Sequence, residues 1–200
     1  TLDAMSMDER MTICNMSIEG GARMGYVNPD ATTVAYLKGR RFAPQGPAFQ
    51  EAADRWLAMA SDEGASYDDR VSFAAGAIAP TVTWGTHPGQ SVAVDELLPD
   101  PRSIEGPERR SVEAALEFMQ LKAGGAIAGQ RVNVAFIGSC TNGRLSDLRE
   151  AAAIVKGHKV ARHVRALVVP GSQQVRSAAE SEGLDRVFLE AGFEWRGAGC

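Results

Sequence analysis

The stretch that decides the fold class runs from Val132 to Arg144 and reads VNVAFIGSCTNGR. Val132–Ile137 is an apolar run with one polar interruption, which is typical of a strand buried in a parallel sheet. After it in the sequence come predicted helices at 145–156, 173–183 and 185–191, with a second apolar strand at 165–169 between the first two. This alternation of strand and helix predicts an α/β fold whose mostly parallel sheet is covered by helices.

The sequence before residue 130 is less regular. Ser6-x-x-Glu9 is similar to a capping box and predicts a helix from there to about Met24. Asp30 is a candidate cap for a short helix that continues to about Lys38. The other expected elements are helices at 47–60 and 109–121, a half-buried strand at 67–73, a β-prone run with a Gly/Pro turn at 79–90, and a linker at 99–108.

Composition excludes several classes of protein. The chain has 200 residues, of which 44% are hydrophobic and 23% charged, as expected for a globular protein. A net charge of -4 argues against an extended surface for nucleic acid, and the longest apolar runs are too short for a membrane span. Three cysteines do not make a secreted disulfide framework, so we expect a reducing, cytoplasmic compartment. Because the chain starts at Thr1 and stops at Cys200, we expect an internal fragment.

Cys140 is the residue best placed to bind a ligand or to react. We expect it at the carboxyl end of a central strand of the sheet and just before a predicted helix, where open parallel sheets bind ligands and where a helix N-terminus favours a thiolate. Small neighbours, Gly138, Ser139 and Gly143, would let a ligand approach the backbone. The bland interpretation, a buried free cysteine in a tight turn, is about equally consistent with this pattern.

Four functional interpretations of the Cys140 loop can be compared with the sequence. No Gly-Lys-Ser/Thr follows, which excludes a phosphate-binding P-loop, and Ser146 stands where a cysteine phosphatase needs its arginine. A hydrolase nucleophile would need a base, and His158 and His163 are candidates by residue type alone. Metal ligation needs more ligands, of which Cys200 could supply one, but two thiolates make an incomplete metal site.

Several motifs together resemble the aconitase family of iron–sulfur hydro-lyases, and within it the branch that acts on isopropylmalate. The spacing of 60 residues between Cys140 and Cys200 (200 − 140 = 60) is the one expected for that branch. The resemblance covers nearly the whole chain in order. The segments that carry it are residues 11–19, 36–40, 83–86, 137–149, 168–175 and 193–200.

The resemblance implies a three-layer α/β/α fold, truncated at both ends. Residues 1–125 would belong to a region with an Asn/Glu active-site helix, and 126–200 to an incomplete cluster-binding region. Cys140 and Cys200 would be two of the three thiolates on a [4Fe–4S] cluster, and the third cysteine would lie beyond the last residue. Asn15 and Glu19 would face the cluster and the substrate from one side of a helix, four positions apart. Two other residues fall outside this scheme, since Cys14 matches no cluster ligand and His87 stands where the family often has Asn.

The activity implied by the resemblance is the interconversion of 2-isopropylmalate and 3-isopropylmalate by dehydration and rehydration, in leucine biosynthesis. A small subunit would be the partner and would supply the base. The chain by itself is expected to be inactive. Two alternatives remain open: another aconitase-family hydro-lyase (a homoaconitase or a methylmalate-type dehydratase), and a non-catalytic truncated binding module.

Overall fold

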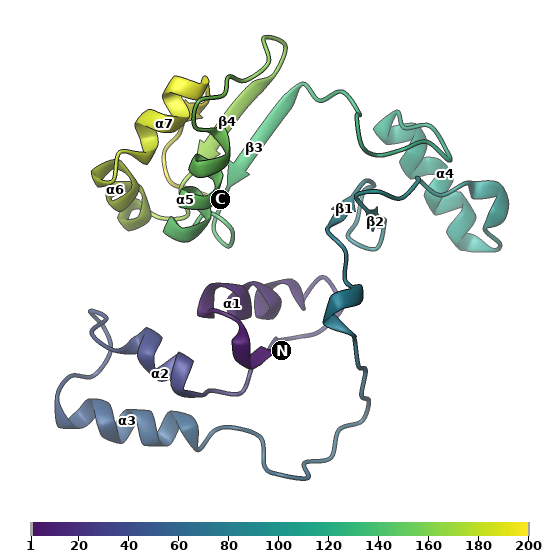
Figure 1. Ribbon diagram of the computed structural model, residues 1–200. Helices are drawn as coiled ribbons and strands as arrows, with labels where there is room; N and C mark the ends of the chain where they lie inside the picture. The colour runs from purple at the N-terminus through teal and green to yellow at the C-terminus, as the bar shows by residue number, and fades with distance from the viewer. Residues whose placement is uncertain (1, 200) are drawn as a thin grey trace. The chain divides into compact units, whose positions relative to one another are not determined.

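The computed structural model describes residues 2–199. The chain divides into two compact units. Figure 1 labels their helices and strands. The first unit combines Thr1–Tyr67 with Val132–Cys200, and the second unit is Asp68–Arg131. The division into regions 1–125 and 126–200 that the family resemblance implies stays a prediction.

A parallel sheet forms the centre of the C-terminal half of the first unit. Its strands are β3 (Val134–Gly138), β4 (Arg165–Val169) and β5 (Glu194–Trp195), in the order β3-β4-β5. The pairings of β3 with β4 and of β4 with β5 are both parallel, which confirms the α/β class and the parallel sheet predicted from the apolar runs. In the sheet of the described residues β3 is an edge strand, so the expectation that Cys140 follows a central strand is wrong there.

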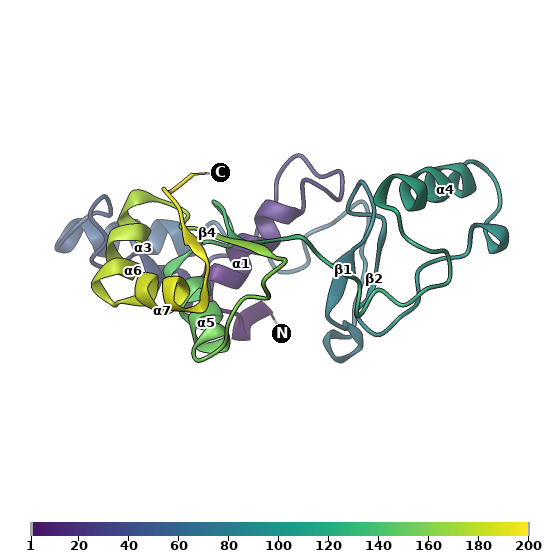
Figure 2. The same cartoon turned by 90° about the horizontal axis from the view of Figure 1, so that it is seen from above.

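Three helices share a hydrophobic core with this sheet, and Figure 2 shows them grouped beside β4. They are α5 (Leu145–Val155), α6 (Gln173–Ser181) and α7 (Leu184–Ala191), each within three residues of its predicted ends. Phe188 of α7 is fully buried at the core and lies 5.6 Å from the Phe193 ring and 6.0 Å from the Trp195 ring. The other fully or nearly buried members of the core are Leu148, Ala152, Val168 and Ala179.

The two faces of β3 differ in burial. Ala135 and Ile137 are half-buried, and Ile137 packs against the core shared with the helices. Val134 and Phe136, which point to the opposite face because side chains alternate along a strand, are each 57% exposed. The continuous apolar run therefore forms a strand as predicted, although in this chain it is not buried on both sides.

The N-terminal half of the first unit is helical. It contains η1 (Leu2–Ala4), α1 (Met7–Met16), α2 (Ala31–Leu37) and α3 (Pro47–Leu57). The capping box at the start of α1 is confirmed, since the Ser6 hydroxyl accepts from the Glu9 amide while the Glu9 carboxylate accepts from the Ser6 amide. The cap of α2 by Asp30 is confirmed as well.

The predicted length of the first helix is wrong, because α1 ends at Met16 rather than near Met24. The Ser17 hydroxyl donates to the Cys14 carbonyl at 2.7 Å, a local bond of the kind that competes with helix continuation. Gly21 then adopts a φ of +89°, which a right-handed helix does not contain.

The second unit consists of a short hairpin and one helix. Strands β1 (Thr81–Thr83) and β2 (Ser91–Ala93) pair antiparallel, and α4 (Pro107–Met119) follows two 3-10 turns, η2 (Ala75–Ala77) and η3 (Pro101–Ser103). The core of this unit consists of Trp84, Leu98, Val112, Ala115 and Leu116.

The strand predicted at 67–73 does not form. Val71 and Phe73 are 67% and 79% exposed, so the weak alternation has no packed face to stabilise it. Within residues 2–199 no helix combines the length and the apolar character that a membrane span requires.

Candidate functional site

The loop that carries Cys140 is folded tightly against the end of β4. Gly138 has a φ of +116°, and a Cβ atom there would lie 2.0 Å from the Val169 carbonyl oxygen. The Ser139 amide donates to that same oxygen at 3.1 Å, and Ser139 itself has a φ of +83°. Gly143 meets the next turn, where its carbonyl accepts from the Gly171 amide at 2.8 Å.

These contacts show one role of the small residues of the loop, which is to let its backbone approach residues 169–171. Their predicted role in letting a ligand approach the backbone stays a prediction. The Cys140 side chain remains exposed, with its sulfur 3.8 Å from the Thr141 hydroxyl. The interpretation of Cys140 as a buried core cysteine is therefore wrong, and the thiol is accessible to a ligand.

Side chains at the end of this loop contact α1, more than 130 positions away in the sequence. Arg144 donates from Nη1 to the Asp8 carbonyl oxygen and to the Thr12 hydroxyl, each at 3.0 Å. Ser146, in the first turn of α5, donates to the Asp8 carboxylate at 2.6 Å. The guanidinium Nε of Arg144 also lies 3.6 Å from the Asp8 carboxylate, which completes an ion pair.

A cleft of about 600 Å³ lies at this junction. Its walls come from α1 and its N-terminal cap on one side and from the end of the Cys140 loop with the start of α5 on the other. The polar residues that line it include Asp8, Glu9, Thr12, Asn142, Arg144 and Ser146. The sequence did not identify Asp8 or Ser146, because no local pattern links them to residues in the other half of the unit.

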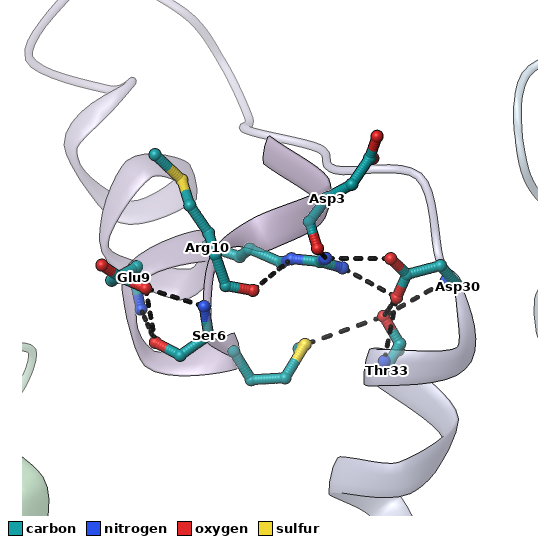
Figure 3. A network of polar contacts seen from close by, with 8 residues as sticks. Asp3, Ser6, Glu9, Arg10, Asp30 and Thr33 are labelled. Carbon is teal, nitrogen blue, oxygen red and sulfur yellow. Dashed lines mark hydrogen bonds and ion pairs between the residues drawn. The ribbon is translucent and has the colours of Figure 1, made fainter. Parts of the chain in front are cut away.

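A second polar network fixes α1 on its other side (Figure 3). Arg10 is buried, and its Nη1 and Nη2 donate to the two carboxylate oxygens of Asp30 at 2.8 Å each. Its Nε donates to the Met5 carbonyl and Nη2 to the Asp3 carbonyl, both at 3.1 Å. The hydrogen bonds from Arg10 are the main reason that the pKa of Asp30 is lowered to about 2, so this carboxylate stays charged at neutral pH.

The predicted active-site pair lies at the end of α1. Asn15 is in the last turn of the helix and Glu19 is in the turn that follows it, and both are exposed. Because α1 ends at Met16, the regular helix expected to carry both residues carries Asn15 only. None of the three predicted residues Asn15, Glu19 and Cys140 lines the cleft. Two residues near them in the sequence, Thr12 and Asn142, do line it. A catalytic role for the pair stays a prediction.

The remaining predicted residues are placed as follows. Cys200 lies outside the described residues. Cys14 is half-buried in α1, and the Gly25 backbone lies so close to it that a Cβ atom at Gly25 would be only 2.4 Å from the Cys14 Cα. His87 belongs to the second unit and lines a separate cavity of about 240 Å³ with Trp84 and Glu108.

An iron–sulfur cluster is held by several donor side chains grouped around it. Among residues 2–199, no three side chains of the His, Cys, Asp or Glu type are grouped as a metal site. Cys140, with its exposed thiol on a closely packed loop at the carboxyl end of β3, fits the role of one ligand. A cluster held by cysteine thiolates requires further cysteines.

Comparison with known proteins shows to which family the chain belongs. The model of the aconitase family (aconitate hydratase) matches residues 1–200. The chain is 59% identical over 201 residues to the 3-isopropylmalate dehydratase large subunit of Sorangium cellulosum, covering 100% of this chain and 43% of that protein. It is 61% identical over 200 residues to the protein of the same name from Thermosynechococcus vestitus, again covering 100% and 43%.

A further relative of that name, from Gloeobacter violaceus, is 59% identical over 200 residues and is covered to 42% of its length. The chain therefore spans less than half the length of the curated relatives it matches. The match to the family model extends over every residue of the chain, including the Cys140 loop and α1. This chain belongs to the aconitase family.

Proposed function

We propose that this chain is part of a [4Fe–4S] hydro-lyase that interconverts 2-isopropylmalate and 3-isopropylmalate in leucine biosynthesis. The observation that carries the proposal is the exposed Cys140 thiol on a loop that follows β3 and packs closely against the end of β4. Identity of 59–61% to three large subunits of that name supports the choice of substrate. We further propose that the protein works in the cytoplasm.

In this proposal Cys140 and Cys200 bind two irons of the cluster, and a third cysteine comes from the part of the relatives' length that the chain does not span. When bound, the cluster supplies a Lewis-acidic iron that polarises the C–O bond of the substrate hydroxyl. Asn15 and Glu19 contact the cluster and the substrate, where Asn15 offers an amide donor and Glu19 a carboxylate acceptor. A separate small subunit supplies the base that removes the neighbouring proton.

The test starts with the chain as it stands. Anaerobic incubation with iron and sulfide is expected to leave the 200-residue chain without a stoichiometric cluster, as read by its visible absorbance and iron content. The longer protein with the small subunit should bind a cluster and interconvert the two isopropylmalates. A stoichiometric cluster with turnover in the 200-residue chain would contradict this assignment of the missing ligand.

Matched cysteine variants of the longer protein sharpen the test. Cys140→Ser should abolish cluster binding, whereas Cys14→Ser, which alters a half-buried cysteine in α1, should retain it. Equal loss in both variants would argue against Cys140 as a ligand. Assays with the substrates of homoaconitase and of methylmalate-type dehydratases test the alternative hydro-lyases, and a longer protein that binds no cluster would favour the non-catalytic binding module.

A further inference from the structure

The junction between α1 and the Cys140 loop is built from charged and hydroxyl groups that satisfy one another. The carbonyl oxygen of Asp8 accepts from Arg144 at 3.0 Å and from the Thr12 hydroxyl at 2.9 Å. The carboxylate of Asp8 accepts from Ser146 at 2.6 Å and pairs with Arg144. One residue of α1 is thus held through its main chain and its side chain at once.

The junction is partly shielded from water. The Arg144 side chain is 19% exposed and that of Asp8 is 32% exposed, so their attraction is screened less than that of a fully exposed pair. Arginine suits this place because its planar guanidinium presents several donors in fixed directions. Here these donors reach a carbonyl, a hydroxyl and a carboxylate, all on α1. The contacts therefore attract α1 to Arg144 and also constrain where α1 lies relative to it.

The end of the Cys140 loop is itself held by hydrogen bonds to neighbouring segments. The Arg144 amide donates to the Asp147 carboxylate at 2.9 Å, which caps the start of α5. Cys140 lies in the same short loop, four residues before Arg144. Between them, the Gly143 carbonyl accepts a hydrogen bond from the Gly171 amide. A displacement of α1 relative to Arg144 is therefore also a displacement relative to Cys140.

We propose that Arg144 and Ser146 are positioning residues that act through Asp8 to hold α1, and with it Asn15, at a fixed place relative to the Cys140 loop. The inference rests on the proposed function, in which Asn15 and Cys140 serve one site. Asp8 and Asn15 are seven residues apart, or about 10 Å along a helix that rises 1.5 Å per residue. A small tilt at Asp8 therefore moves Asn15 by a larger amount.

Positioning is separable from folding because α1 has a second anchor. Arg10 ties it to Asp30 at the start of α2, within the first 30 residues. Loss of the Asp8 contacts leaves that anchor and the capping box at Ser6 in place. We therefore expect α1 to remain a helix and to lose only its fixed relation to the loop.

Hydrogen exchange of the 200-residue chain tests the junction without any cluster. Ser146→Ala should make amides of 140–144 and of α1 exchange about tenfold faster, the change expected when a hydrogen bond to a charged group is lost. Ser146→Thr keeps the hydroxyl and should exchange like the wild type. Ser181→Ala is the matched control, because its hydroxyl donates to the Ser177 carbonyl in α6, away from the junction.

Two outcomes of the exchange measurement would overturn the junction: unchanged exchange in Ser146→Ala, or equal acceleration throughout β4 and α6, which would indicate global destabilisation. Asp8→Asn provides a second variant should Ser146→Ala fold poorly. It keeps the main-chain contact and the shape of the side chain but removes the ion pair with Arg144, and should accelerate the same amides.

Kinetics of the longer, cluster-bearing protein with its small subunit test whether the position matters for the reaction. Ser146→Ala should lower kcat about tenfold at unchanged cluster content and similar KM, and Ser146→Thr should restore kcat. An unchanged kcat beside faster exchange would overturn the positioning role. A wild-type protein without turnover would refute the proposed function instead, and the exchange data would still decide whether the junction holds α1.

Discussion

Arg10 and Asp30 form a two-point ion pair in which each terminal guanidinium nitrogen donates to one carboxylate oxygen at 2.8 Å. The two side chains differ in exposure, since that of Arg10 is 3% exposed and that of Asp30 is 37% exposed. Asp30 also accepts from the Thr33 amide at 3.1 Å, so the same carboxylate caps α2. One charged group therefore joins the start of α2 to the middle of α1, the helix that carries Asn15.

This pair predicts acid sensitivity of the first unit. The pKa of Asp30 is lowered from 3.8 to about 2, mainly by hydrogen bonds from Arg10. A carboxyl whose pKa is lower in the folded than in the unfolded state contributes stability above its unfolded pKa and loses that contribution as the pH falls through the folded pKa. Asp30 should therefore stabilise the fold fully above about pH 4 and lose this effect towards about pH 2.

The variant Asp30→Asn tests this window. The difference between the urea midpoints of the wild type and Asp30→Asn should be constant near neutral pH and shrink between about pH 4 and about pH 2. Taking a difference removes the contributions of other carboxyls, such as Glu182 and Glu194, whose pKa values are lowered by hydrogen bonds from Arg149 and Arg165 respectively. A difference that does not vary with pH would show that Arg10 and Asp30 are not paired in solution.

The glycine at the end of β3 should tolerate no side chain. Gly138→Ala combines a left-handed φ with a Cβ placed 2.0 Å from the Val169 carbonyl oxygen. Gly192→Ala is the matched control, with a φ of +96° but no atom closer than 3.7 Å to the new Cβ. We expect the control to lose about 1–3 kcal/mol of unfolding free energy from backbone strain, and Gly138→Ala to lose more. Urea unfolding measures both, and equal losses would mean that the loop does not press on Val169.

The core beneath the sheet predicts a strong contrast between two neighbouring residues of α7. Phe188→Ala should lower the unfolding free energy by about 3–5 kcal/mol, because it empties a fully buried site in contact with two aromatic rings. Leu189→Ala, at a side chain that is 54% exposed, should change it by at most about 0.5 kcal/mol. Denaturant titration of both variants checks this, and similar losses would contradict the placement of α7 on the sheet.

Cysteine accessibility gives a test of the site that needs no cluster. Cys140 is exposed and Cys14 is half-buried, so a maleimide under native, reducing-agent-free conditions should modify Cys140 first. Peptide mass spectrometry separates the two positions from Cys200. In denaturant the preference should vanish, because both thiols are then equally accessible. Faster modification of Cys14 in the native chain would show that the Cys140 loop is folded differently.

Local patterns were sufficient for much of the fold. The strands at 134–138 and 165–169 and the helices α5, α6 and α7 were predicted within three residues, because apolar runs and helical spacing depend on near neighbours in the chain. The motif around Cys140 was equally visible, since a glycine-rich turn between strand and helix is a local feature. The caps at Ser6 and Asp30 belong to the same category.

Tertiary packing decided the rest. The strand β5 has two residues, Glu194 and Trp195, and exists because it pairs with Leu167 and Val168 of β4. The expected helix past Met16 gives way to a turn in which Ser17 bonds to Cys14. These features arise from competition between a local preference and contacts made elsewhere, which the chain order alone does not rank.

The contacts of Arg144 show the same division most clearly. By sequence it is only the last residue of a loop motif, and Asp8 is only an acidic residue in the first turn of a distant helix. They meet because β3, its loop and the start of α5 carry Arg144 to α1, 136 positions away. Sequence patterns predicted the alternating strands and helices of the C-terminal half and placed Cys140 just after the end of a strand, whereas the folded chain decided that its thiol is exposed. Only the folded chain determined which helix the loop holds, because hydrogen bonds between distant residues depend on packing that no local periodicity encodes.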